Sequence, residues 1–264
     1  GDFADAAAAE GYKDTVEFLV QQGAETNAQG GVHGTALQAA AKKGHKDIAE
    51  FLVQQGAEIN AQGGGDYGTA LQAAAYWGHQ DIVKFLVQKG AKLNAQDGDY
   101  GFTLQAAIAG GHKDIVEFLL QQGAEINAWC GDYGTALQAA AAWGNKDIVE
   151  FLLQQGAEIN AQGGIYGTAL QAAAKKGHKD IVKFLVQQGA EINAQGGDYG
   201  TALQAAAARG HQDIVEFLIQ HSAEINAQGG DYDTALPAAA ADVPNKSAQR
   251  DDTSTAQAQP CTAG

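Results

Sequence analysis

Apolar and polar residues follow one another along this chain in a pattern that repeats about every 33 residues. The leucine of the tetrapeptide Thr-Ala-Leu-Gln, or its equivalent, marks each copy and falls at Leu37, Leu71, Leu104, Leu137, Leu170, Leu203 and Leu236. The intervals are 34, 33, 33, 33, 33 and 33 residues, and one added glycine in the run 63–65 accounts for the longer one. A fixed period of this size predicts stacked repeats, because one short unit cannot bury its own apolar face.

Each copy is expected to hold two helices and a connector, as residues 166–199 illustrate. Thr168 and Gln171 have the spacing of a capping box, which predicts that the alanine-rich segment after Thr168 is a short first helix. Gly177 should end it, since glycine accepts the left-handed backbone that closes a helix. A second helix begins near Asp180, whose charge suits the positive helix end, and Gly189 ends it. Its apolar face consists of Ile181, Val182, Phe184, Leu185 and Val186. The Gly-, Asp- and Asn-rich remainder predicts an extended connector with a turn at its tip.

The same capping box is expected in most other copies. It recurs as Thr35 with Gln38, Thr69 with Gln72, Thr135 with Gln138 and Thr201 with Gln204. In the third full unit Phe102 occupies the Thr position and Thr103 the Ala position. That helix start is therefore predicted to lack its box.

This order of elements resembles the ankyrin repeat over roughly residues 1–242. The resemblance is carried by Gly-Thr-Ala-Leu-Gln-Ala-Ala, Gly-His-x-Asp-Ile-Val, Phe-Leu and Gly-Ala-Glu-Ile-Asn-Ala, repeated in register. It implies an all-α ankyrin-repeat solenoid of stacked helix-turn-helix units with β-hairpin-like fingers. The family usually has Pro and His where this chain has the Ala and Gln of Thr-Ala-Leu-Gln. That variant, with Gly-Gly and Tyr-Gly at the fingers, resembles the long ankyrin arrays attached to fungal NACHT-type signalling proteins.

The repeats divide the chain into four parts. We expect a truncated capping repeat over residues 1–33, six full repeats over 34–232 and a half repeat over 233–242. Residues 243–264 are rich in Ser, Thr, Gln, Asp and Ala. A low-complexity, disordered tail is predicted there, because the segment has few apolar residues to bury. The chain begins in mid-repeat, which is typical of a fragment of a longer protein.

Charge and cysteine content narrow the class of protein. The formal net charge is -15, which argues against a nucleic-acid binder, because phosphate binding needs a cationic surface. Two cysteines, Cys130 and Cys261, cannot form a disulfide framework, so an intracellular, cytoplasmic location is expected. The apolar runs are far shorter than the roughly 20 residues that span a bilayer, so no membrane partner is expected.

The positions that differ most between copies lie at the end of the first helix, just before the Gly-His pair. By the family resemblance these positions line the concave groove of the array. The residues that we expect to bind a partner there are Lys42, Lys43, Tyr76, Trp77, Trp143, Lys175, Lys176 and Arg209. They predict a protein or peptide partner that carries acidic residues around an apolar anchor. The alternative is that they are solvated helix ends, with the tryptophans covering neighbouring alanines.

The finger positions form a second, weaker candidate set: Tyr67, Tyr100, Trp129, Tyr133, Tyr166 and Tyr199. Their near-constancy between copies points first to a structural role, with each tyrosine stacking on the next finger. Trp129 and Cys130 replace the usual Gln and Gly, and we expect them to extend the aromatic patch of Trp143.

The repeated histidines and aspartates predict neither a metal site nor catalysis. One histidine per repeat cannot converge on an ion, because stacked helices lie about 8–10 Å apart and zinc ligands about 2 Å from the metal. His45, His79, His112, His178 and His211 should instead bond the turn between fingers. No cofactor is expected. Two functions remain. The first is a non-enzymatic interaction scaffold that serves as the sensor part of a larger fungal signalling protein. The second is a self-assembling solenoid whose copies join head to tail through the array ends or the tail.

Overall fold

The computed structural model describes residues 2–30, 34–63, 67–96, 98, 100–129, 131–232 and 234–240. The predicted tail, Cys130, and the finger residues Val32, His33, Asp66 and Asp99 lie outside these ranges. Asp233, where the predicted half repeat begins, also lies outside them. The chain forms two compact units, Gly1–Glu125 and Ile126–Gly264, which we call unit 1 and unit 2.

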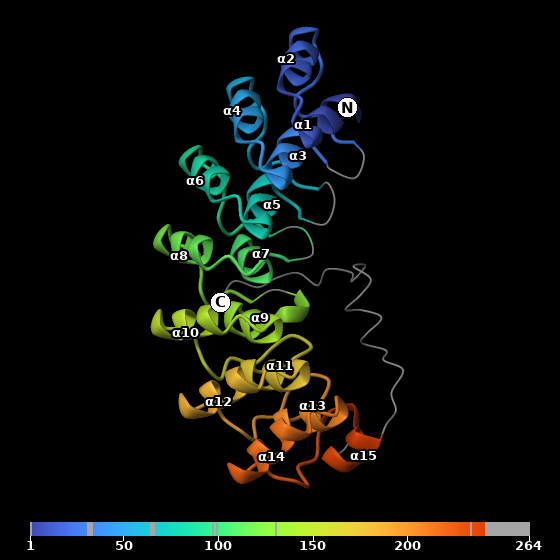
Figure 1. Ribbon diagram of the computed structural model, residues 1–264, viewed down its shortest axis with the longest axis vertical. Coiled ribbons are helices and arrows are strands. Elements are labelled where there is room, and N and C mark those ends of the chain that lie inside the picture. Colours follow the sequence, from blue (N-terminus) through green and yellow to red (C-terminus); the bar gives the residue numbers. More distant parts are fainter. Residues whose placement is uncertain are drawn as a thin grey trace. The chain divides into compact units, whose positions relative to one another are not determined.

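Unit 1 is built from four helix pairs (Figure 1). The first helices of the pairs are α1 (Asp2–Glu10), α3 (Ala36–Lys43), α5 (Ala70–Trp77) and α7 (Thr103–Ala109). The second helices are α2 (Lys13–Gln21), α4 (Lys46–Gln54), α6 (Gln80–Gln88) and α8 (Lys113–Gln121). First helices pack on first helices and second helices on second helices, so the unit has two helical layers.

Unit 2 repeats this arrangement. Its first helices are α9 (Ala136–Trp143), α11 (Ala169–Lys176), α13 (Ala202–Ala208) and α15 (Ala235–Ala240), and its second helices are α10 (Lys146–Gln154), α12 (Lys179–Gln187) and α14 (Gln212–Gln220). Short 3-10 turns, η2 (Gly131–Tyr133) and η3 (Gly230–Tyr232), lie in two fingers. The all-α array of stacked helix pairs predicted from the sequence is confirmed in each unit.

The predicted capping boxes start α3, α5, α11 and α13, and at α9 only the bond from the Thr135 N–H to the Gln138 side chain is formed. In α11 the Thr168 hydroxyl accepts the backbone N–H of Gln171, and the Gln171 side chain accepts the N–H of Thr168. Gly177 follows with a φ of 82° and closes the helix, as predicted. The expected exception also holds, because Phe102, the residue directly before α7, makes no side-chain cap.

The first helices are thin and almost wholly buried. Leu37, Leu71 and Leu137 are each 1% exposed, and the alanines that follow them are buried as well. Because alanine has a small side chain, neighbouring first helices approach closely and exclude water without large gaps. On α12 the apolar face is narrower than predicted, since Ile181, Val182 and Leu185 are buried while Phe184 and Val186 are half-buried.

The fingers are hairpin-like but contain no extended ladder in the described residues. Isolated antiparallel bridges join Gly30 to Gly34, Gly163 to Gly167 and Gly196 to Gly200. In unit 2 each finger also bonds to the next one. The Ile165 N–H donates to the Asp132 carbonyl (3.0 Å), Asp198 to Ile165 (3.1 Å) and Asp231 to Asp198 (2.9 Å).

The Gln of the capping box has a second role that joins neighbouring repeats. Gln72 is fully buried, its Oε1 accepts the Thr69 N–H at 2.8 Å, and its Nε2 donates to the Gly101 carbonyl of the next repeat at 2.6 Å. Gln171 does the same from Thr168 to Gly200. One amide thus caps its own helix with its oxygen and holds the next finger with its nitrogen, which is how Gln serves at a position where the family usually has His.

A second ladder between repeats runs through asparagines that the sequence analysis overlooked. The Asn27 Oδ1 accepts the Glu58 N–H at 2.7 Å, and the Asn160 Oδ1 accepts the Glu191 N–H at 2.9 Å. The same relation holds for Asn60 with Lys92, Asn94 with Glu125, Asn127 with Glu158 and Asn193 with Glu224. The sequence does carry a sign of this ladder, because an asparagine recurs at the same connector position in every copy.

Candidate functional site

The helix-end positions and the finger positions, predicted as two separate candidate sets, meet in space in each unit. The last turn of a first helix and the finger of the same or the next repeat supply the side chains. Because glycine closes the helix directly after this turn, the helix-end side chains are held at a defined place beside the fingers.

In unit 1 these side chains form a packed aromatic group, the unit 1 cluster, which consists of Lys42, Tyr67, Tyr76, Trp77 and Tyr100. The rings of Tyr67 and Tyr100 stack with centroids 6.1 Å apart and planes 14° from parallel. Tyr76 lies 4.9 Å from each of them, and Trp77 meets Tyr76 edge-on at 5.5 Å. The Lys42 ammonium lies over the Tyr67 ring, 5.0 Å from its centroid.

In unit 2 the corresponding group is richer in cations. The unit 2 cluster consists of Tyr133, Trp143, Tyr166, Lys175, Lys176, Tyr199 and Arg209. Tyr133 stacks on Trp143 at 5.8 Å and lies 5.8 Å from Tyr166. The Lys175 ammonium lies 4.6 Å from the Tyr166 centroid and 4.9 Å from that of Tyr199. Lys176 also lies over Tyr166, at 5.8 Å, and Arg209 over Tyr199, at 5.7 Å.

Exposure separates the members of the clusters into two kinds. Trp77 and Trp143 are 48% and 41% exposed. Lys43 and Lys176 are exposed as well. Lys175 and Tyr166 are 3% exposed, so these two build the surface from beneath. The concavity that the family resemblance implies for this surface stays a prediction.

Trp129 lies against the next finger, and its expected extension of the aromatic patch of Trp143 stays a prediction. Its indole lies against Gly163 of the next finger, where a Cβ atom would come within 2.1 Å of Nε1. Trp129 has no ring contact with the unit 2 cluster in the ranges that the structure describes. The sequence could not show this, because the absence of a side chain at Gly163 is what makes room for the indole.

The histidines bond a different group from the one predicted. His79 Nε2 lies 3.1 Å from the Lys42 carbonyl oxygen, at the end of the preceding first helix, not in a turn between fingers. The remaining four pairs are His45 with Ala9, His112 with Tyr76, His178 with Ala142 and His211 with Lys175, at 2.9–3.1 Å. The last carbonyls of a helix have no partner within it, which explains the choice of acceptor.

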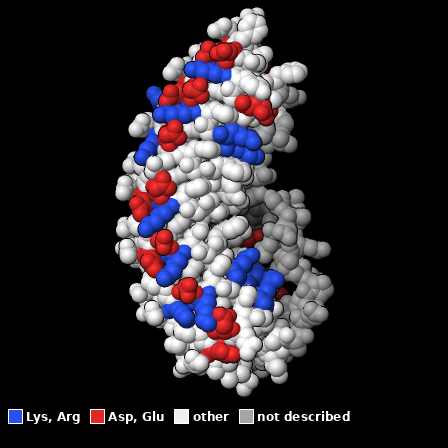
Figure 2. Space-filling model, viewed as in Figure 1, with Lys and Arg blue, Asp and Glu red and all other residues white. Residues whose placement is uncertain are grey.

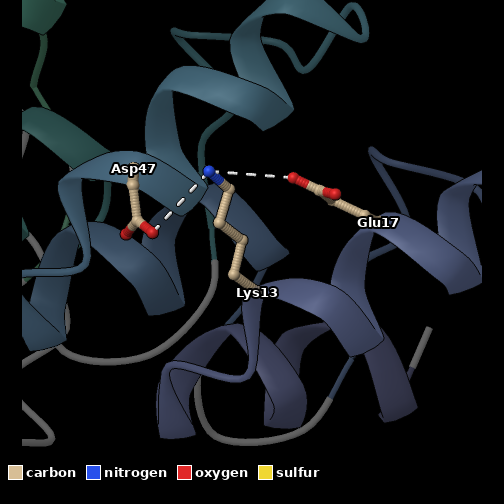
Figure 3. A network of polar contacts seen from close by, with 3 residues as sticks. All are labelled: Lys13, Glu17 and Asp47. Atoms are coloured by element: carbon tan, nitrogen blue, oxygen red, sulfur yellow. Dashed lines mark ion pairs between the residues drawn. The ribbon is translucent and has the colours of Figure 1, made fainter.

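Charged side chains on the second helices are arranged in exposed ion pairs. Lys46 pairs with Glu50, Lys113 with Glu117 and Lys146 with Glu150, each one helical turn apart. Lys13 lies between Glu17 of its own helix (3.7 Å) and Asp47 of the next second helix (3.9 Å), as Figure 3 shows. Exposed pairs of this kind contribute at most about 1 kcal/mol each.

One of these pairs changes a carboxyl group's titration. Lys179 Nζ lies 3.0 Å from Asp213 on the neighbouring second helix. The hydrogen bond from Lys179, together with its positive charge and backbone hydrogen bonds, lowers the pKa of Asp213 below its ordinary value of 3.8. Figure 2 shows blue and red side chains alternating over the second helices of each unit.

The cations of the two clusters lie apart from these alternating side chains. Figure 2 shows separate blue patches over the regions of α3 and α11. The last turns of these two helices carry Lys42 with Lys43 and Lys175 with Lys176. A cation at a helix C-terminus is favoured by the helix dipole, so these lysines fit their local position whether or not they also meet a partner.

Paired helices stacked at a 33-residue period, joined by side-chain ladders and carrying a variable surface at one helix end, define the class of helical repeat proteins. A family model described as "Ankyrin repeats (3 copies)" matches residues 4–97, 99–163 and 164–240. The chain therefore belongs to the ankyrin-repeat family. Domains of this family are in general non-enzymatic protein-interaction modules.

A solved structure supports the same assignment. The chain is similar to the ankyrin repeat domain of human ASB11, with a TM-score of 0.72 and 26% identity. The match covers 84% of this chain and 98% of that domain. A sequence search of curated proteins finds no match. Among the described residues, none of the helices has the length and apolar character needed to cross a membrane.

Proposed function

We propose that the chain is a non-enzymatic scaffold that binds a peptide segment or a protein surface at the unit 1 and unit 2 clusters. The observation that carries this proposal is that two tryptophans are both half-exposed and packed against other rings. Trp77 and Trp143 expose 48% and 41% of their surface, yet each is held by contacts to tyrosine rings. A rigid, half-exposed aromatic side chain loses little conformational entropy on binding, and tryptophan is enriched at binding hot spots.

The partner that fits these clusters is acidic around an apolar anchor. Both clusters place cations beside aromatic rings, and the protein as a whole carries a net charge of -15. An acidic segment is repelled by most of such a surface and attracted where the cations gather, which directs it to the clusters. The tryptophans supply the apolar contact.

Capture experiments with matched variants test the proposal. Trp77→Ala and Trp143→Ala, alone and together, should reduce capture of a partner from a cell lysate at least tenfold, because hot-spot aromatics contribute about 2 kcal/mol or more. Phe18→Ala is the control, since Phe18 is 60% exposed and belongs to the second helix α2. Thermal unfolding should show that all variants fold. Undiminished capture by the double tryptophan variant would remove the clusters as the binding surface.

Two finer proposals rest on the sequence alone. The Thr-Ala-Leu-Gln variant, with Gly-Gly and Tyr-Gly at the fingers, supports the proposal that the array is the sensing part of a larger fungal NACHT-type signalling protein. The presence of only two cysteines supports an intracellular location. Neither proposal is needed for the binding surface.

Self-association is the second candidate function, and one observation favours it. Leu236 on α15 is 78% exposed, whereas its repeat equivalent Leu203 is 2% exposed. Phe3 on α1 is 81% exposed. An apolar contact between two different faces of the same chain can continue from copy to copy. Light scattering across a concentration series tests this: a constant 27.3 kDa argues against it, and a mass that rises with concentration supports it.

A further inference from the structure

We propose that the unit 2 cluster is a carboxylate-binding subsite for an acidic peptide segment, contacted by Lys176 and Arg209. This inference rests on the proposed function and makes it more specific, since it assigns the acidic part of the partner to one cluster. Both clusters hold four aromatic rings, but the unit 1 cluster has one cation, Lys42, and the unit 2 cluster has three.

The tyrosine rings of the subsite are supported from beneath by Lys175. Its side chain is 3% exposed, and its ammonium lies close to the faces of both Tyr166 and Tyr199. Burying a charge is costly unless other groups compensate it, and the negative faces of aromatic rings do so in part. Lys175 therefore belongs to the frame of the subsite and adds positive potential without reaching a ligand.

Lys176 and Arg209 lie over the same two rings and are more exposed than Lys175. Lys176 is exposed and Arg209 half-buried, at 5.8 Å from the Tyr166 centroid and 5.7 Å from the Tyr199 centroid. A guanidinium held against a ring binds a carboxylate through its in-plane N–H groups, often with two parallel hydrogen bonds. The Lys176 ammonium is a second cationic donor at the same rings.

The local charge is balanced in a strongly acidic chain. The fingers contribute Asp132, directly before Tyr133, Asp198, directly before Tyr199, and Asp231 in the next finger. Three cations face these three carboxylates, whereas the whole chain is at -15. An acidic ligand that binds this protein must therefore do so through a local feature, because the net charge opposes it.

Short peptides of defined charge test the subsite directly. Fluorescein-labelled hexaglutamate and hexaglutamine are titrated with the full chain at low salt, and binding is followed by anisotropy. We expect hexaglutamate to bind and hexaglutamine not to bind. Added salt should weaken the complex, since the contacts are exposed ion pairs. A thymidine oligomer of six nucleotides, which is also anionic, should bind more weakly than hexaglutamate.

Charge-matched variants within unit 2 locate the site. Lys176→Gln with Arg209→Gln should weaken hexaglutamate binding about tenfold, which corresponds to about 1.4 kcal/mol. Lys146→Gln with Lys179→Gln removes the same charge from second helices, where both lysines already pair with carboxylates. This control should change the affinity less than threefold.

Three results would overturn the subsite: no binding of hexaglutamate, equal loss in both double variants, or tighter binding of the oligonucleotide than of hexaglutamate. These results test the subsite, whereas the capture experiment tests the tryptophan anchors. If hexaglutamate does not bind but partner capture still needs Trp77 and Trp143, only the carboxylate subsite is lost. If hexaglutamate binds as expected but the tryptophan variants still capture their partner, the proposed anchors fail and the subsite stands.

Discussion

The imidazole of His79 donates from Nε2 to the backbone carbonyl of Lys42, one repeat earlier, across 3.1 Å. A carbonyl oxygen can only accept, so this nitrogen must carry a proton. The side chain of Lys42 meanwhile lies over the Tyr67 ring in the unit 1 cluster. One residue thus holds the stack together with its backbone and contributes to the candidate binding surface with its side chain. Substitution of the side chain can therefore vary the surface without disturbing the stack.

The first prediction concerns the glycine beside this hydrogen bond. Gly44 has a φ of +83°, and a Cβ atom there would lie 2.6 Å from His79 Cε1. Gly56 has a φ of +86° but nothing within 4 Å of its Cβ position. Gly56→Ala should cost about 1–2 kcal/mol through backbone strain alone. Gly44→Ala should cost about 1 kcal/mol more, because the ring must move and the hydrogen bond is lost. If urea unfolding shows the same loss of free energy of unfolding for Gly44→Ala and Gly56→Ala, the role of His79 is contradicted.

The second prediction concerns the Gln that joins two repeats. Gln72→Leu leaves the buried Gly101 carbonyl without its Gln72 donor, while the Thr69 N–H keeps the Tyr67 carbonyl as an acceptor. It should lower the free energy of unfolding by about 1–3 kcal/mol, the cost of one unpaired buried group. Gln88→Leu, at an exposed position near the end of α6, should change it by less than about 0.5 kcal/mol. If both variants unfold at the same urea concentration as the wild type, Gln72 is not a joint between repeats.

The third prediction uses one chemical change with opposite effects at two positions. The Thr103 hydroxyl is buried without a hydrogen-bond partner, and all five equivalent interior positions hold alanine: Ala36, Ala70, Ala136, Ala169 and Ala202. Thr103→Ala should therefore stabilise the chain by about 1 kcal/mol. Thr69→Ala should destabilise it by a similar amount, about 1 kcal/mol, because it removes a helix cap. Thermal unfolding would contradict this account if both variants moved the midpoint in the same direction.

The fourth prediction concerns acid. Because Lys179 lowers the pKa of Asp213 in the folded state, the stabilisation by this pair is present above the ordinary value of 3.8 and is lost as the pH falls below it. Lys179→Gln should raise the pKa of Asp213 toward 3.8. NMR titration of the Asp213 carboxyl carbon measures this. An unchanged pKa in the variant would mean that the ion pair does not form in solution.

The period, the helix starts and the helix ends could all be predicted from the sequence, because each depends on local chemistry. The box of Thr168 with Gln171, the stop at Gly177 and the missing box at Phe102 all need only residues within a few positions of one another. The 33-residue register of the leucines follows directly from their spacing in the sequence. These features were found where predicted.

The features that escaped prediction depend on contacts between repeats. Tyr76 packs on Tyr100 of the next finger, and Lys175 lies between Tyr166 and Tyr199 of the next finger, only because stacking brings fingers and helix ends together. From the sequence, fingers and helix ends were predicted as separate sets, and Lys175 was predicted to be one of the partner-binding cations. Its 3% exposure places it beneath the surface. The second hydrogen bond of Gln72 lies 29 residues away in the chain, beyond any local pattern.

The measurement that tests the proposed binding surface most directly is hydroxyl-radical footprinting of the chain with and without a captured partner. Trp77, Trp143, Tyr12 and Phe18 are all exposed enough to react in the free chain, at 48%, 41%, 60% and 60%. The partner should protect Trp77 and Trp143 from oxidation several-fold. The oxidation of Tyr12, which precedes α2, and of Phe18, which lies on α2, should stay unchanged. Protection of Tyr12 and Phe18 with full reactivity of both tryptophans would contradict the account and place the partner on the second helices.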